Sequence, residues 1–148
     1  MRRAPPANPA VPPPPAAALR ASATLVVVRD APAGIEVLLL RRAENGGDAY
    51  SGAWVFPGGM VDARDRACHG VVGAALDDAA ASARLGLKAG GLDYYVAAVR
   101  ECFEESGLLF ATDASGALPA LVEAGPRSAA IAAGRAPLHR GETRLEDL

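Results

Sequence analysis

Residues 100–108 read Arg100-Glu101-Cys102-Phe103-Glu104-Glu105-Ser106-Gly107-Leu108, and this stretch is the most informative in the chain. Its three glutamates have the i, i+3, i+4 spacing that places side chains on one face of an α-helix, and Gly107 is a natural C-terminal cap. Like charges at this spacing each cost roughly 0.2–0.5 kcal/mol in an isolated helix. Carboxylates in the last turn also face the negative end of the helix dipole, which costs typically a further ~0.3–1 kcal/mol each.

Two interpretations of this acidic cluster compete. A solvated polar face is the usual meaning of several glutamates on one helix. A bound divalent cation would instead reverse the electrostatic cost, because Mg²⁺ is held by one or two carboxylates together with waters and substrate phosphates. Arg100 offsets only part of the negative charge. The helix cap and the arginine together favour metal binding.

The stretch resembles the second half of the signature of the Nudix hydrolases, Arg-Glu-apolar-x-Glu-Glu-x-Gly-apolar. The first half of that signature, Gly-x5-Glu, follows an aromatic residue and a Pro-Gly-Gly run, as in residues 54–59 (Trp-Val-Phe-Pro-Gly-Gly). Six residues after Gly59, Asp65 stands where the family has glutamate. An insertion of about residues 66–92 then separates the two halves. A split signature is similar to that of the peroxisomal coenzyme A diphosphatases and their bacterial relatives.

This resemblance implies a fold, a reaction and a set of site residues. Nudix hydrolases cleave a diphosphate linkage in nucleoside-diphosphate derivatives by attack of water, using Mg²⁺ or Mn²⁺. Glu104 and Glu105 match the principal metal ligands, and Glu101 matches a ligand or a water-orienting base. Arg100 matches the residue that orients the glutamates, and the backbone carbonyl of Gly59 joins the metal shell. Asp65 would complete the outer part of the site.

The segment before the Pro-Gly-Gly run suggests a substrate. Residues 38–43 (Leu-Leu-Leu-Arg-Arg-Ala) match the start of the motif of the coenzyme A-hydrolysing members, whereas the middle arginine of that motif is replaced by Gly47. The expected substrate is therefore coenzyme A or an acyl-CoA. Arg42 is the candidate phosphate contact. Gly58 and Gly59 are further candidate substrate contacts, because backbone without a Cβ can approach a ligand closely.

Composition gives the domain organisation. The chain has 148 residues, enough for one domain, and a net charge of −2, which does not indicate a nucleic-acid or anionic-membrane partner. Residues 1–20 contain seven prolines and no acidic residue, so we expect a disordered tail followed by a domain over residues 21–148. No stretch approaches the ~20 apolar residues of a membrane span. Both cysteines are expected to be reduced thiols, and a cytoplasmic location is expected.

The first half of the domain predicts short strands. Thr24–Val28 and Ile35–Leu40 are β-branched or apolar runs, and the turn-forming residues 30–34 between them predict a hairpin. Continuous apolar runs indicate strands that are covered on both faces. Residues 54–56 predict another short strand. Within the insertion, apolar residues at helical spacing predict a helix from Val71 to Ala83 that ends near Gly86.

Further details of the helices can be predicted. Asp77 and Asp78 should face away from the buried side of the insertion helix, and His69 is expected at the surface. Asp93 is a good N-cap residue for the glutamate helix. Its buried stripe is predicted to contain Tyr95, Val99, Cys102 and Phe103. After it, residues 108–111 predict a strand, residues 119–133 predict a helix in two pieces, and residues 138–140 lead into a charged tail.

The predicted fold class is α/β (α+β), a Nudix-like mixed β-sheet between helices. Only three or four strands are recognisable before Leu148, so the fold is expected to be incomplete at its C-terminus. Three functional classes remain open. They are a diphosphatase, a catalytically impaired or truncated nucleotide-binding module on the same scaffold, and an interaction protein that uses the proline-rich tail.

Overall fold

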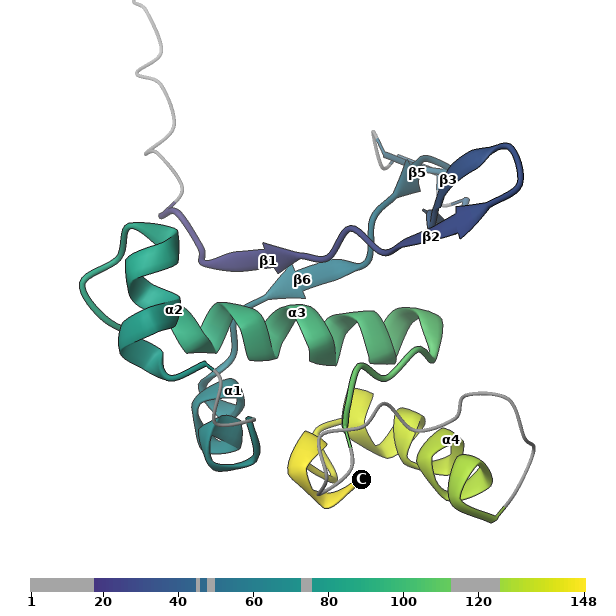
Figure 1. Cartoon of the computed structure of the whole chain (residues 1–148). Helices are drawn as coiled ribbons and strands as arrows, with labels where there is room; N and C mark the ends of the chain where they lie inside the picture. The colour runs from purple at the N-terminus through teal and green to yellow at the C-terminus, as the bar shows by residue number, and fades with distance from the viewer. Residues whose placement is uncertain (1–17, 45, 48–49, 73–75, 113–125) are drawn as a thin grey trace, which may run out of the picture.

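The computed structural model describes residues 18–44, 46–47, 50–72, 76–112 and 126–148. In these residues, six short strands and three other α-helices surround one long central helix, α3 (Gly91–Ser106) (Figure 1). The α/β class expected from the sequence is confirmed. The predicted tail of residues 1–20 lies almost wholly outside the described residues.

The strands form three antiparallel pairs. β1 (Ser22–Thr24) pairs with β6 (Gly58–Met60), β2 (Val28–Ala31) with β3 (Gly34–Val37), and β4 (Leu40–Arg41) with β5 (Trp54–Val55). The predicted hairpin is confirmed as β2–β3, with its turn at residues 32–33. Gly34 has a φ of 127°, a conformation that favours glycine. Thr24, predicted as part of that hairpin, belongs instead to β1 and lies opposite Gly58.

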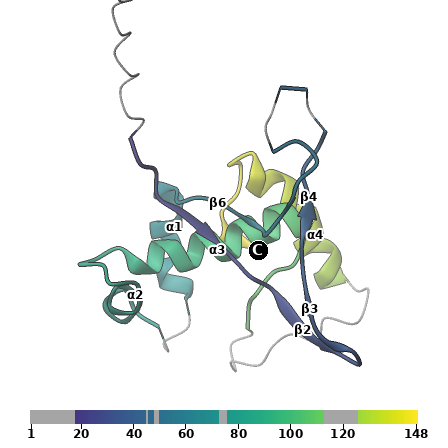
Figure 2. The same ribbon diagram turned by 90° about the horizontal axis from the view of Figure 1, so that it is seen from above.

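The expectation that these strands are covered on both faces is wrong. The side chains of the β2–β3 region are largely exposed, with Ile35 at 71% and Val28 at 57%. The reason is visible in Figure 2, where the hairpin extends away from α1 and α2. Within the part of the chain that the structure describes, β2 and β3 hydrogen-bond as a strand pair only to each other.

The insertion contains more structure than predicted. It holds the end of α1 (Ala63–Ala67), a 3₁₀-helix (η1, Cys68–Val71) and α2 (Asp78–Leu85). Gly86 ends α2 in the left-handed conformation, as predicted. The predicted helix nevertheless begins too early, since Val71 lies in η1. Asp77 and Asp78 do not simply face away: Asp77 caps α2, and Asp78 accepts hydrogen bonds from the backbone of residues 90 and 92.

Helix α3 is the element against which most others pack. It contacts α1, α2, β1, β6 and α4 (Pro126–His139). Its buried side chains include Leu92, Val96, Cys102 and Phe103, whereas the predicted stripe residues Tyr95 and Val99 are only half-buried. The helix begins two residues before the predicted N-cap, since Gly90 is the N-cap and Asp93 lies in the first turn. Gly107 ends the helix with a φ of 80°, as predicted.

The segment after α3 differs from the sequence prediction. Residues 108–112 form no strand, and residues 113–125 lie outside the described residues. The second predicted helical piece is confirmed as α4, but it extends to His139. Leu138, predicted in a tail, belongs to α4 and is 1% exposed, so its side chain is part of the core. A short 3₁₀-helix (η2, Leu145–Asp147) follows.

No helix in the described ranges is both long enough and apolar enough to cross a membrane.

Candidate active site

A buried ion pair between α3 and α1 forms the centre of the candidate site. Arg100 Nε donates to Asp65 Oδ1 at 2.7 Å, and Arg100 Nη2 lies 3.2 Å from Asp65 Oδ2. The side chain of Asp65 is fully buried and that of Arg100 is 5% exposed. Burial lowers the pKa of Arg100, but its ion pairs with Asp65 and Glu101 more than offset this and raise the pKa above the ordinary arginine value. The arginine is therefore a fixed positive charge.

Local sequence explains how Asp65 is held. Asp62 and Asp65 form a reciprocal capping box at the start of α1, in which the backbone N–H of Asp62 donates to Asp65 Oδ2 at 2.7 Å. The Asp62 side chain accepts from the backbone N–H of Arg64, which lowers the pKa of Asp62. The carboxylate of Asp65 is thus fixed by the helix cap on one side and by Arg100 on the other.

Arg100 connects this pair to the glutamates. Its Nη1 donates to Glu101 Oε1 at 2.8 Å and to Glu104 Oε1 at 3.3 Å. Its Nη2 also donates to the carbonyl of Met60 at 2.9 Å, at the end of β6. Arg100 therefore pairs with Glu101 and Glu104, and its role of orienting the glutamates stays a prediction.

The glutamates lie against the Pro-Gly-Gly bend. A Cβ built on Gly59 would lie 2.5 Å from both carboxylate oxygens of Glu101, so any larger residue at this position would displace that carboxylate. Glu105 Oε2 accepts a hydrogen bond from the backbone N–H of Gly58 at 3.0 Å. A Cβ on Gly58 would clash with the backbone of β1. The structure therefore brings together the residues that the sequence predicted at Gly58, Gly59, Glu101 and Glu105.

Helix α4 contributes contacts that the sequence did not predict. His139 Nδ1 lies 3.1 Å from Glu104 Oε2. Arg135 donates from Nε to the Glu104 carbonyl at 2.8 Å and from Nη2 to the Glu105 carbonyl at 2.6 Å. Histidine and arginine near a helix C-terminus are common, and no spacing in the sequence links residues 135–139 to the glutamates. These contacts depend on tertiary packing alone.

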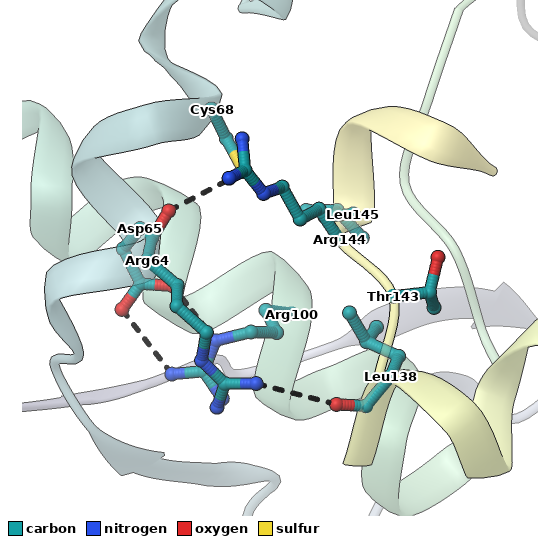
Figure 3. Close-up of a pocket in the computed structure, with 8 residues that line it drawn as sticks. All are labelled: Arg64, Asp65, Cys68, Arg100, Leu138, Thr143, Arg144 and Leu145. Atoms are coloured by element: carbon teal, nitrogen blue, oxygen red, sulfur yellow. Dashed lines mark hydrogen bonds and ion pairs between the residues drawn. The ribbon is translucent and has the colours of Figure 1, made fainter. Parts of the chain in front are cut away.

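Behind Arg100 there is a small cavity, shown in Figure 3. Its volume is about 10 Å³, room for about one water molecule. It is lined by residues of α1, α3, α4 and the C-terminal segment. Arg64 Nη1 on α1 donates to the Leu138 carbonyl on α4 at 3.5 Å. Burial raises the pKa of the Cys68 thiol that lines it. A space of this size cannot hold a nucleotide.

The donor set is suitable for a divalent cation, although its members are not gathered around one point. The candidate ligands Glu101, Glu104, Glu105 and the Gly59 carbonyl all offer oxygen, which hard cations prefer. Gly59 leaves open the space that a Cβ would fill beside Glu101. Within the described ranges, however, no three or more His, Cys, Asp or Glu side chains are arranged to hold a metal ion. Glu104 instead contacts Arg100 and His139, and Glu105 contacts Gly58.

Arg42, the predicted phosphate contact, lies on a different strand pair. Its backbone N–H donates to the carbonyl of Ala53 at 3.0 Å, which extends the β4–β5 pair by one residue. The side chain is exposed. The glutamate turn borders β6 rather than β4–β5, so the contacts described above do not include Arg42.

Comparison with known proteins gives two matches. The NUDIX domain family matches residues 19–123 of the chain. A crystal structure of a NUDIX hydrolase from Alicyclobacillus acidocaldarius is similar, with 30% sequence identity and a TM-score of 0.56. The match covers 86% of this chain and 54% of that chain, so the present chain spans about half of its length. No curated protein matches.

Proposed function

We propose, from the premise that this chain belongs to the Nudix family, that it is a metal-dependent hydrolase of a diphosphate linkage in a nucleoside-diphosphate derivative. The observation that supports this best is the placement of Glu101 and Glu105 against Gly59 and Gly58. Carboxylate oxygens and half-buried glycine backbone meet there, beside the fixed charge of Arg100.

Each residue of the site would have its own role in this reaction. Asp65 holds Arg100, and Arg100 holds the carboxylates of Glu101 and Glu104. Glu101, Glu104, Glu105 and the Gly59 carbonyl would hold Mg²⁺ or Mn²⁺. When bound, such an ion polarises phosphoryl oxygens and lowers the pKa of its water. Glu101 is the candidate for orienting the attacking water, because its carboxylate occupies the space beside Gly59 that a Cβ would fill.

Coenzyme A or an acyl-CoA is the leading substrate, on the strength of the motif at residues 38–43. The test is hydrolysis by the full chain with Mg²⁺, comparing coenzyme A, a nucleoside triphosphate and a dinucleotide polyphosphate at equal concentration. Faster turnover of coenzyme A supports the proposal. Equal or faster turnover of either competitor would rule out coenzyme A as the leading substrate. If none of the three compounds is hydrolysed in the presence of Mg²⁺, the proposed hydrolase activity is wrong.

The alternative is a nucleotide-binding module without turnover. It is favoured by the contacts of Glu104, whose carboxylate lies between Arg100 and His139, and by the shorter carboxylate at position 65. A single-turnover experiment, with protein in excess over nucleotide, separates the two functions. Binding without product would support the module, and product formed in one turnover would support the enzyme.

A further inference from the structure

Helix α4 lies across the C-terminal end of α3 (Figure 1). Arg135 of α4 makes two hydrogen bonds to this end, to the backbone carbonyls of Glu104 and Glu105 at 2.8 Å and 2.6 Å. These are the two residues expected to be the principal metal ligands. Helix α4 begins at Pro126, after the segment 19–123 that matches the family. Arg135 therefore lies outside the segment that the family model matches.

The end of α3 needs such a partner. The last four carbonyls of any helix have no partner within the helix, and α3 has no basic residue in its last turn. The N–H of Gly107 caps the carbonyl of Phe103 at 2.8 Å, and the next two carbonyls are those that Arg135 binds. Three carboxylates also lie near this negative end of the helix dipole, where a cation is stabilising.

Arginine suits this position because its planar guanidinium presents several N–H donors in a fixed fork. One Arg135 side chain therefore satisfies two adjacent carbonyls and adds a positive charge at the same place. Its hydrogen bonds go to the backbone of the turn and not to the carboxylates of Glu104 and Glu105. His139, one turn later on α4, contacts the Glu104 carboxylate itself.

We infer that Arg135 is a positioning residue for metal binding. It keeps the last turn of α3 helical, so that Glu105 remains beside Gly58 and Glu104 remains beside Arg100. This inference rests on the proposed function, since it presumes that these glutamates bind the cation. The role resembles that of outer partners around metal sites, which fix the ligands without touching the metal.

The test replaces Arg135 by methionine in the full chain, which keeps the apolar stem and removes the guanidinium. Arg140→Met is the matched control, because it removes the same charge from the residue after α4, where the Arg140 side chain pairs with Glu142. Calorimetric titration with Mg²⁺ alone measures affinity without turnover. Arg135→Met should weaken Mg²⁺ binding by about tenfold, the size seen when outer partners of metal ligands are lost, and Arg140→Met should not change it.

A second readout does not depend on metal. In the metal-free protein, amide hydrogen exchange over residues 103–107 should be faster in Arg135→Met and unchanged in Arg140→Met. Arg135→Lys should recover only part of the Mg²⁺ affinity, because one ammonium lacks the planar fork that spans both carbonyls. Full recovery with lysine would show that charge alone suffices, and would overturn the inference.

The remaining outcomes separate the two proposals. If the wild type binds Mg²⁺ and Arg135→Met binds it equally well or more tightly, the inference fails and the proposed function stands. Tighter binding would mean that the guanidinium mainly repels the cation. If the wild type does not bind Mg²⁺ at all, the proposed function fails, and the inference fails with it.

Discussion

Both ends of α3 carry carboxylates, but the helix dipole makes negative charge favourable at the start of the helix and unfavourable at its end. At the start, Asp78 accepts hydrogen bonds from the backbone N–H groups of Gly90 and Leu92, both at 3.0 Å. Asp93, in the first turn, pairs with Arg66 at 3.0 Å and lies 2.7 Å from His69 Nε2. Negative groups at a helix N-terminus are stabilising. At the end, three glutamates occupy the region where negative charge is unfavourable.

This difference indicates what each end is for. The start is arranged for stability, since its carboxylates satisfy N–H groups and pair with the insertion. The end carries an electrostatic cost, because three carboxylates lie near the negative end of the dipole. Two contacts with other helices offset this cost: the hydrogen bonds of Arg135 on α4, and the ion pair of Arg100 with Asp65 on α1. Local rules that fail at one place in an otherwise consistent sequence usually mark a functional site. If the comparison holds, substitutions at the end should affect function, and substitutions at the start should affect stability.

The largest effect is expected from Glu104→Gln and Glu105→Gln. Each removes one negative charge and keeps the shape of the side chain, so metal-dependent hydrolysis should fall by more than about 100-fold, beyond the loss typical of outer residues. The metal-free fold should be as stable as the wild type or slightly more stable, because repulsion in the last turn is relieved. Activity assays and thermal unfolding without metal measure both. Lost stability with unchanged Mg²⁺ affinity would make the cluster structural.

The next largest effect is expected from breaking the ion pair between Asp65 and Arg100. Asp65→Ala would leave the buried Arg100 without its principal partner, which should cost about 3–5 kcal/mol in the free energy of unfolding. Hydrolysis should also fall, because Arg100 would no longer be fixed beside Glu101 and Glu104. Urea unfolding at pH 7 measures the first effect. A loss below about 1 kcal/mol would show that Arg100 finds another partner or that water enters the site.

Sequence predicted the glutamate end of α3 better than it predicted the residues of other elements that contact this end. The glutamate spacing, the cap at Gly107 and the Pro-Gly-Gly bend are local patterns, and the structure places the bend beside Glu101 and Glu105. Asp65 was recognised only by its distance from Gly59. Its burial against Arg100, 35 positions away in the chain, depends on tertiary packing. The contacts of Arg135 and His139 carry no local signal at all.

The errors in the fold have a related cause. Apolar runs such as residues 24–28 were interpreted as strands covered on both faces, but periodicity does not say whether any element covers them. His69 was expected at the surface, yet its side chain is 25% exposed and faces Asp93 from the insertion. Asp93 was predicted as the N-cap because it is a good capping residue. The helix begins earlier, since Asp78 of α2 accepts the hydrogen bonds from the backbone N–H groups of Gly90 and Leu92.

The close contact between α2 and the start of α3 should be sensitive to volume. A Cβ on Gly91 would lie 2.6 Å from the carbonyl carbon of Ala81 and would also meet the backbone of Ser82. Gly91→Ala should therefore destabilise the fold by about 1–3 kcal/mol, the usual cost of overpacking. The wild-type rate should be retained in the folded fraction, as measured at low temperature. A more stable variant would show that α2 can move aside without cost.

The smallest effect is expected from Asp78→Ala, which removes the side-chain acceptor from the start of α3. The melting temperature at pH 7 should fall less than in Asp65→Ala, and activity should be unchanged.

Hydrogen bonds from the backbone of Gly90 and then Leu92 hold the pKa of Asp78 below its ordinary value of 3.8. A carboxyl with a lowered pKa in the folded state stabilises the fold fully above its unfolded value, and this contribution is lost as the pH falls through the folded value. The difference in melting temperature between wild type and Asp78→Ala should therefore be constant from about pH 7 to pH 5 and should shrink below pH 3.8. A difference that does not change at low pH would contradict this origin. A loss of activity comparable to that of Glu105→Gln would show that the two ends of α3 are coupled, and the contrast between them would fail.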